Sequence, residues 1–403
     1  MNIPVIIPYT DERETEEIAK VIDSGWVAQG PKVVEFERLV AEHEGIVHGI
    51  ATTSCTTALH LAMHAIGIGV GNDILVPSFT FVASANSIFH TGAMPRFVDI
   101  KQDTFCIDSI SVRQYIDKHY IKVNDRLVNK QGGNILVAIM VVHQFGLCAD
   151  MSALSCIANE YSLRIIEDSA CALGAMIGDK HQGAFGNLSC LSFHPRKSIT
   201  TGEGGMILTD DDELARQLKS LRSHGAAISA LDRHNYKSFA LSPFDRIGYN
   251  YRMTDIQAAM GIAQMEKFDF ILDARRKRAA RYNELLSEFG WLIRPVEPEG
   301  YFHTYQSYVC MIRLDGITTI EGGKKRDRLI AALAEKGIAT RQGAHASHML
   351  ECYQKMYDIV PDDIPNSCTC DRLSITLPLY VQMTDAEQDY VVEQLREGYL
   401  CLV

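Results

Sequence analysis

The sequence predicts an α/β fold with a mainly parallel, seven-stranded sheet, followed by a smaller α+β domain. Short apolar runs alternate with amphipathic runs through the first two thirds of the 403 residues, which is typical of parallel sheets covered by helices. After Trp291 this alternation gives way to strands around a single helix. At about 150 residues per domain the length also favours two domains, which we place at residues 1–264 and 265–403.

The chain begins with a group of helices. They are predicted over Asp11–Asp23, from Pro31 to about Gly45 and over Thr56–Ile66. The first has capping-box spacing at its start, and the second begins with proline, which is favoured in a first helical turn. In the third, apolar residues recur at i, i+3, i+4 and i+7, as one buried face of a helix requires.

Buried strands and intervening helices follow. The longest clean apolar run, Ile135–Val142, is far too short to span a bilayer and suits a buried strand. Shorter strands are predicted over Ile74–Val76, Arg96–Val98, Arg164–Ile166, Ser189–Phe193 and Met206–Thr209. Helices are predicted over Thr80–His90, Met151–Glu160 and Asp211–Ser223.

A long helix is predicted from Thr254, which forms a capping box with Gln257. The basic run at 274–281 continues this pattern and predicts a solvated helix face rather than a nucleic-acid site. The remaining elements are strands over Tyr308–Leu314 and Gly337–Gln342, a helix at about Arg326–Glu335 and a final helix after Thr384.

Composition excludes several classes of protein. The formal net charge of −11 disfavours binding to a phosphate backbone, so we expect no nucleic-acid partner. The first residues show no secretory signal, and we expect no membrane association. The 11 cysteines are scattered without CxxC pairs, which indicates reduced thiols in a cytoplasmic protein, with neither a disulfide framework nor a metal site.

The most informative stretch carries two carboxylates and a lysine. Glu167 and Asp168 end a buried strand, where parallel sheets bind ligands. Lys197 follows on a short loop between two strands, ahead of a glycine-rich bend, and burial is expected to lower its pKa. Pyridoxal phosphate needs such a pair, with the lysine on its aldehyde and the aspartate on its ring nitrogen. The alternative is an ordinary surface lysine and a helix-capping aspartate.

The chain as a whole resembles the DegT/DnrJ/EryC1/StrS sugar aminotransferases, which are pyridoxal-phosphate enzymes of fold type I, the aspartate-aminotransferase-like fold. The resemblance extends from about Ile6 to the final helix. It is carried by the segments SGWVAQGPKVVEFE, TTSCTTALHLAM, VPSFTFVASANSI, VHQFGLCADM, IIEDSACALGA, LSFHPRKSITTGEGGMILTD and GYNYRMTDIQAAMG. Seven such segments in the same order are far more specific than any one of them.

The resemblance implies roles for the cofactor residues. Lys197 would bind the cofactor as a Schiff base and act as the catalytic proton carrier, and Asp168 would pair with the pyridine nitrogen. Phe81 would stack on the cofactor ring, the alternative being a core phenylalanine. Cys55 and Thr56 would bind the phosphate at a helix N-terminus, where backbone N–H groups attract anions.

Three further residues are assigned by the resemblance. Ser192 would add a hydrogen bond to the phosphate. Asn250 would reach the phosphate of the neighbouring subunit in a homodimer with shared active sites. The alternative for Asn250 is that it orders its own loop. Cys171 replaces the glutamine or histidine with which many relatives touch the cofactor ring hydroxyl. A thiol is a weak donor, so this contact is expected to differ here. Many relatives also have glycine at Cys55, but the backbone N–H survives that change.

The implied reaction moves an amino group from L-glutamate to a nucleotide-linked keto-sugar. Amination at C4 of a 4-keto-6-deoxy sugar is favoured, as in perosamine-synthase-like members, for bacterial surface polysaccharides or glycans, and C3 remains open. The N-terminal segment 1–30 is expected near the substrate. The candidate substrate residues are Trp26, Gln29, Arg196, His303, Tyr305, Arg341 and His345.

Two other functions fit the same fold. Sugar dehydratases of this kind replace the lysine with histidine, whereas Lys197 is present here. A non-catalytic protein that binds the cofactor or a sugar would not need Lys197 and Asp168 together with a phosphate site. Turnover separates these functions, because a binding protein would release no 2-oxoglutarate.

Overall fold

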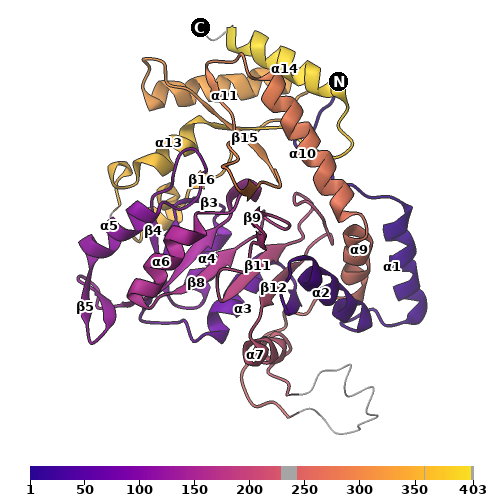
Figure 1. Cartoon of the computed structure of the whole chain (residues 1–403), viewed down its shortest axis with the longest axis vertical. Coiled ribbons are helices and arrows are strands. Elements are labelled where there is room, and N and C mark those ends of the chain that lie inside the picture. Colours follow the sequence, from indigo (N-terminus) through magenta and orange to yellow (C-terminus); the bar gives the residue numbers. More distant parts are fainter. Residues whose placement is uncertain (228–242, 358, 401–403) are drawn as a thin grey trace.

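A nine-stranded sheet lies at the centre of the computed structural model, which describes residues 1–227, 243–357 and 359–400 (Figure 1). Seven strands, the predicted number, form its main path in the order β1-β12-β11-β8-β7-β2-β4, and a β5–β6 hairpin, which was not predicted, adds to β7. Pairing is parallel from β11 to β4 and antiparallel at β1–β12 and β12–β11. The strands are β1 (His48–Thr52), β2 (Asn72–Pro77), β4 (Met94–Val98), β5 (Tyr120–Val123), β6 (Arg126–Asn129), β7 (Ile135–Val142), β8 (Arg164–Asp168), β11 (Leu188–Ser192) and β12 (Gly205–Thr209).

Helices cover both faces of this sheet, because successive side chains of a strand point to opposite faces. In β7, Ala138 and Met140 pack in a cluster with α3, α4 and α7, whereas Ile139 and Val141 pack with α5 and α6. The covering helices are α2 (Pro31–His43), α3 (Cys55–Ala65), α4 (Ala83–His90), α5 (Ser109–His119), α6 (Met151–Tyr161), α7 (Asp212–Arg222) and α9 (Asp255–Met265), with α1 (Glu12–Ser24) beside α9.

The C-terminal part has its own core. A three-stranded sheet in the order β13-β15-β17 packs with long helices in one hydrophobic cluster. Ile3 belongs to this cluster and pairs with Ile338, so the first residues of the chain lie against the C-terminal part, beside α10 and α14 in Figure 1. Its elements are α10 (Phe268–Leu285), β13 (Leu292–Ile293), β15 (Tyr308–Ile312), α11 (Thr319–Glu335), α13 (Pro365–Leu373), β17 (Ser374–Leu377) and α14 (Asp385–Leu400). The boundary at residues 264 and 265 remains a prediction.

Short elements connect the larger ones. These are β3 (Phe79–Thr80), β9 (Met176–Ile177), β10 (Lys180–His181), β14 (Tyr301–Phe302), β16 (His345–Ala346) and α12 (Glu351–Gln354). They form two small sheets, β10-β9-β14 and β16-β3, and both join segments far apart in the sequence. Among the described residues, no helix combines the length and the apolar character that a bilayer crossing demands.

Several predicted boundaries are wrong. The strand predicted over Gly337–Gln342 is absent; this segment makes only single bridges, at Ile338 and Arg341. The helix predicted from Arg326 begins at Thr319, because Thr318 and Glu321 form a capping box farther upstream. The helix predicted from Thr80 begins at Ala83, since Thr80 is paired in β3. The long helix predicted from Thr254 is two helices, α9 and α10, separated at 266–267.

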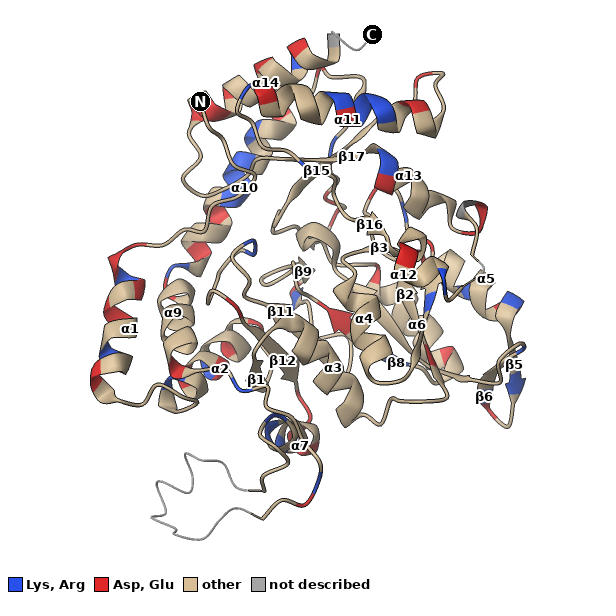
Figure 2. Cartoon of the chain, turned by 180° about the vertical axis from the view of Figure 1, so that it is seen from behind, with Lys and Arg blue, Asp and Glu red and all other residues tan. Residues whose placement is uncertain are grey.

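Figure 2 shows basic residues in blue along α10, and the side chains of this run are only partly solvated. Arg278 and Arg281 pair with Asp385 and Asp389 of α14. Arg275, by contrast, is 2% exposed, and its guanidinium donates to the backbone carbonyls of Tyr305 and Gln306 at 2.6–3.2 Å. The prediction of a solvated face is therefore wrong for Arg275, which holds a loop instead.

Candidate active site

The predicted carboxylate and lysine meet at one edge of the central sheet. Asp168 is the last residue of β8 and lies beside Cys190 in the parallel neighbour β11. Lys197 follows β11 on a short loop that begins with a turn, in which the Lys197 N–H donates to the His194 carbonyl at 2.8 Å. The chain then enters β12, so the lysine lies on a loop between two strands, as predicted.

Asp168 is a buried carboxylate held by neutral donors. Its Oδ2 accepts from the Ser84 hydroxyl at 2.7 Å and its Oδ1 from the Ala170 N–H at 3.2 Å. It is 5% exposed, and burial raises its pKa, although these two hydrogen bonds act in the opposite direction. A cation facing this carboxylate would offset that cost, which a protonated pyridine nitrogen can do.

Glu167 does not share this site. Adjacent residues of a strand point to opposite faces, and the Glu167 carboxylate accepts from the backbone N–H groups of Gly183 and Gly186 at 2.8 and 2.6 Å. It also lies 2.8 Å from Nε2 of His143. Of the two carboxylates predicted at the strand end, only Asp168 faces the lysine loop. Glu167 lies on the opposite face of the sheet and holds the backbone at Gly183 and Gly186.

Lys197 is half-buried and donates from Nζ to the Cys171 sulfur at 3.1 Å. Burial lowers the pKa of this amine, but the neighbouring Cys171, Cys55 and Asp168 outweigh burial and raise the pKa above its usual value. The predicted lowering by burial is therefore present, but it does not decide the net direction of the shift. The thiols and the carboxylate thus favour the charged form of the amine.

The N-terminus of α3 lies against the same pocket. Ser54 caps this helix in a capping box with Thr57, and Cys55 and Thr56 follow in the first turn. The Cys55 sulfur lies 3.9 Å from Oδ1 of Asp168. A Cβ on Gly205 would overlap the Ser54 carbonyl carbon and the Cys55 nitrogen, so only glycine lets β12 approach this closely. Ser192 is half-buried at the end of β11.

Phe81 follows β3 and is 70% exposed, whereas its neighbour Phe79 is fully buried. The alternative prediction of a core phenylalanine is therefore wrong for Phe81. The β3–β16 pairing places His345 opposite Thr80, and the His345 side chain is 54% exposed. The structure thus leaves the Phe81 ring, just after β3, and the His345 imidazole, in the paired strand β16, accessible to solvent.

The N-terminal segment is fixed beside α9. Asp255 accepts from the backbone N–H groups of Gly30, Lys32 and Val33 at 2.7–3.1 Å, which supplies the cap that α2 lacks. The Trp26 indole donates to the Gln29 carbonyl at 3.1 Å. Gln29 lines a cavity of about 530 Å³ between α2 and α7. Both predicted substrate residues thus belong to one turn held by Asp255.

The two predicted arginines lie within electrostatic reach of each other. Burial lowers the pKa of Arg341, and the charge of Arg196 lowers it further, while Cys171 acts in the opposite direction. Arg341 Nε is buried without a hydrogen-bond acceptor. Arg196 is exposed, and its carbonyl accepts from the Gln306 amide at 2.5 Å. Two neighbouring guanidinium groups close to the cysteine and lysine favour an anionic ligand.

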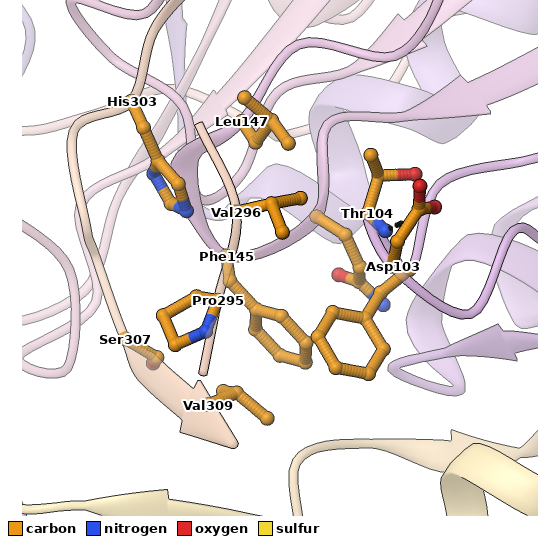
Figure 3. A pocket seen from close by; sticks show the side chains of 11 residues that line it. Asp103, Thr104, Phe145, Leu147, Pro295, Val296, His303, Ser307 and Val309 are labelled. Atoms are coloured by element: carbon orange, nitrogen blue, oxygen red, sulfur yellow. Dashed lines mark hydrogen bonds between the residues drawn. The ribbon is translucent and has the colours of Figure 1, made fainter. Parts of the chain in front are cut away.

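His303 and Tyr305 are buried, at 3% and 4% exposure, with rings stacked 4.0 Å apart. Burial, with a contribution from Arg276, lowers the pKa of His303 to about 3, so the ring is neutral at physiological pH. The pocket beside His303 in Figure 3 encloses about 10 Å³, roughly the room for one water. These two side chains therefore form a buried wall rather than an open binding surface.

Asn250 is exposed and pairs through its backbone with Ser223. It lies just before Tyr251, whose carbonyl accepts from the Thr53 N–H at 3.1 Å, next to the start of α3. An exposed asparagine there is available to a neighbouring subunit, and its role in a shared site stays a prediction.

Ser84, Gly205 and Gln306 were missed in the sequence. Ser84 could have been noticed because it and Ser87, three residues apart, place two hydroxyls on one face of a short helix. Gly205 belongs to the glycine-rich bend, but the need for glycine arises from its contact with Ser54, far away in the chain. No local signal identifies Gln306 as a partner of Arg196.

The chain belongs to the DegT/DnrJ/EryC1/StrS aminotransferase family, whose profile matches residues 8–396. It is 35% identical over 396 residues to GDP-perosamine synthase of Caulobacter vibrioides, covering 98% of this chain and 97% of that protein. It is 31% identical over 396 residues to the spore coat polysaccharide biosynthesis protein SpsC of Bacillus subtilis, covering 98% and 96%. These findings confirm the predicted family and the predicted enzyme class.

The fold agrees with solved structures. The putative sugar aminotransferase Spr1654 of Streptococcus pneumoniae, in its PMP form, is 25% identical, covers both chains completely and superposes with a TM-score of 0.89; its PLP form gives 0.88. The aspartate-aminotransferase-like fold is thereby confirmed, and pyridoxal phosphate is the cofactor of this family. Asp168, Lys197 and the N-terminus of α3 bring a buried carboxylate, an amine and the first N–H groups of a helix close together, and groups of these kinds fit a pyridine nitrogen, an aldehyde and a phosphate.

Proposed function

We propose that the protein transfers an amino group from L-glutamate to a nucleotide-linked keto-sugar, in the biosynthesis of amino sugars for surface polysaccharides or glycans. A 4-keto-6-deoxy sugar is the favoured acceptor, since the relative at 35% identity is named for perosamine synthesis. The observation that carries the proposal is the convergence of Lys197, Asp168 and the start of α3 at one sheet edge. We place the activity in the cytoplasm, in keeping with the free thiols of all cysteines among the described residues.

Lys197 is proposed as the catalytic residue. Bound pyridoxal phosphate supplies an electron sink for the carbon next to the transferred nitrogen. The Lys197 amine takes the proton from the α-carbon of the donor and returns it to the cofactor carbon, and the sugar half of the reaction runs these transfers in reverse. Cys171, at 3.1 Å from Nζ, is the first partner of the freed amine.

The other cofactor residues are proposed to hold charge and orientation. Asp168 keeps the ring nitrogen protonated, and Ser84 fixes one oxygen of that carboxylate. The backbone N–H groups of Cys55 and Thr56 bind the phosphate, because the first N–H groups of a helix have no partner within it. Ser192 adds a hydroxyl to the phosphate, and the exposed Phe81 ring covers the cofactor face.

The sugar nucleotide is proposed to bind on the side of the two arginines. Arg196 and Arg341 attract its diphosphate, and Arg341 Nε has an unused hydrogen. Trp26, Gln29 and His345 lie on accessible segments and contact the sugar or base. His303 and Tyr305, which are buried, support the wall behind these contacts instead of reaching the ligand directly.

We also propose a homodimer in which Asn250 completes the site of the other subunit. The test mixes Lys197→Ala and Asn250→Ala chains, each of which is weakly active or inactive alone. A mixed dimer has one site with both native residues, so random mixing should restore about a quarter of the native activity. Activity no greater than that of either parent would remove the support for shared sites.

The reaction is tested by absorption and turnover. Addition of L-glutamate to the cofactor-loaded protein should abolish the visible absorption of the bound cofactor and release 2-oxoglutarate. The treated protein is then supplied with nucleotide-linked 4-keto-6-deoxy and 3-keto sugars, and amino-sugar products are identified by mass spectrometry. A loaded protein that ignores glutamate contradicts the donor, and one that reacts with glutamate but aminates no sugar nucleotide contradicts the acceptor.

A further inference from the structure

A cluster of metal-ligating side chains lies away from the active site, where α2 ends. His43 is the last residue of α2, Glu44 follows it, and His181 belongs to β10. One ligand atom of each residue lies within 4.8 Å of the other two. His43 Nδ1 is 2.8 Å from Glu44 Oε1, and His181 Nδ1 is 3.7 Å from Glu44 Oε2. Residues far apart in the sequence thus present two imidazole nitrogens to one carboxylate.

The Glu44 carboxylate is buried, with a side-chain exposure of 0%. Neutral amides hold its two oxygens: the Gly174 N–H donates to Oε1 at 3.0 Å and the Gln182 amide to Oε2 at 2.6 Å. A buried carboxylate needs a compensating positive charge as well as hydrogen bonds. His181 Nδ1 is also buried and has no hydrogen-bond partner. The cluster therefore combines a buried negative charge with an unused nitrogen lone pair or N–H group.

Neighbouring side chains hold His43 and Gln182 in place by hydrogen bonds or ion pairs, as residues around a metal site hold its ligands. His43 Nε2 lies 3.6 Å from the Asp269 carboxylate, which leaves Nδ1 directed toward Glu44. Gln182 is itself held by the Ser189 hydroxyl at 2.7 Å. Ligating histidines commonly direct their second nitrogen to a carboxylate, which fixes the ring and its tautomer. The side chains of His43 and His181 are 25% and 22% exposed, so an ion can enter.

We propose that His43, Glu44 and His181 form a site for one divalent zinc ion, bound through Nδ1 of each histidine and one oxygen of Glu44. Two imidazoles and one carboxylate are a ligand set that zinc accepts, with a fourth position for water. The ion balances the Glu44 charge and joins the end of α2 to β10. Through Glu44 and Gly174 it also braces the chain that follows Asp168 and Cys171. The site is independent of the proposed sugar substrate.

The test uses the cofactor-loaded protein after removal of metals with a chelator. Zinc is titrated in competition with a chromophoric chelator, and the native chain is compared with His181→Ala and Glu44→Gln. The control is His64→Ala, because His60 and His64 form another histidine pair, with ring centres 6.4 Å apart. We expect one zinc ion per chain, an affinity about 100-fold lower in the two site variants, and native affinity in the control.

Two readouts decide whether zinc binds at this cluster. X-ray absorption of the zinc-loaded protein should show a first shell of nitrogen and oxygen only; sulfur in that shell would assign the ion to cysteines and overturn the proposal. Equal affinity in the native chain and His181→Ala would also overturn it, and the cluster would then be a His43–Glu44 ion pair without a metal. If Glu44→Gln does not fold, His181→Ala alone decides, since that side chain is partly exposed.

Discussion

The cofactor side and the substrate side of the active site are assembled differently. Asp168 ends β8 and Lys197 follows the neighbouring parallel strand β11, and Asp168 is buried among fixed donors. Arg196 and Arg341, proposed for the substrate, come from segments far apart in the chain, and Arg341 Nε has no acceptor. A preorganised site and an unsatisfied one sit side by side. The difference fits a proposed cofactor site that is preorganised and a proposed substrate site in which Arg341 Nε gains its acceptor from the ligand.

The largest loss of activity is expected for Lys197→Ala, a substitution on the cofactor side. Loss of the amine removes the only proposed proton carrier, so turnover should fall by at least about 1,000-fold. Steady-state release of 2-oxoglutarate measures this effect, and Lys324→Ala, an exposed lysine of α11, serves as the control. Substantial turnover in a clean Lys197→Ala preparation would contradict the assignment.

Asp168→Asn removes the charge but keeps the shape of the buried partner. Turnover should fall by about 100-fold, because the ring nitrogen loses its stabilising carboxylate. Glu167→Gln is the matched comparison, since Glu167 points to the opposite face. It should lower the melting temperature while the chemistry continues. Equal losses of turnover in the two variants, measured at a temperature where both are folded, would contradict the separation of these neighbouring carboxylates.

The substrate side is tested with Arg341→Ala. Loss of a charged hydrogen bond should raise the KM for the sugar nucleotide by about tenfold and leave kcat nearly unchanged. Arg313→Ala, an exposed arginine after β15, is the control. If the KM for glutamate rises instead, the arginine pair binds the donor carboxylate and the proposed place of the diphosphate is wrong.

The smallest effect is expected from Cys171→Ala. Because Cys171 contributes to the raised pKa of Lys197, its removal should lower that pKa in the cofactor-free protein. An acylating reagent that requires the neutral amine should then modify Lys197 at lower pH, as followed by mass spectrometry. The exposed Cys156 provides the control variant Cys156→Ala. An unchanged pH dependence would show that Asp168 and Cys55 alone hold the charge.

The raised pKa of Lys197 makes the stability of the folded chain depend on pH. A lysine whose folded pKa is raised stabilises the folded chain at all pH values below its unfolded pKa, and this contribution disappears as the pH rises through the folded value. The cofactor-free native chain should therefore lose more stability between neutral and alkaline pH than Cys171→Ala loses. Denaturant unfolding at a series of pH values measures the difference.

The sequence was sufficient where local signals decide structure. Capping boxes located the starts of α1, α9 and α14, and the apolar run Ile135–Val142 is β7 without change. It failed where distant contacts decide. The charge of Arg275 predicted solvent exposure, but carbonyls some 30 residues away bury it. The same holds in the site, where Lys197 was evident from its loop, whereas Cys171 reversed its expected pKa shift through a tertiary contact.

Gly205 affects the geometry of the candidate active site although it has no side chain. Because a single added carbon would collide with the first turn of α3, this glycine sets the spacing between the strand that follows the lysine loop and the anion-binding end of the helix. In a library of random variants, we therefore expect substitutions of Gly205 to be poorly tolerated, although this residue contributes no reacting atom. Because Gly205 has no side chain, β12 can lie close to the start of α3, which is the proposed phosphate site.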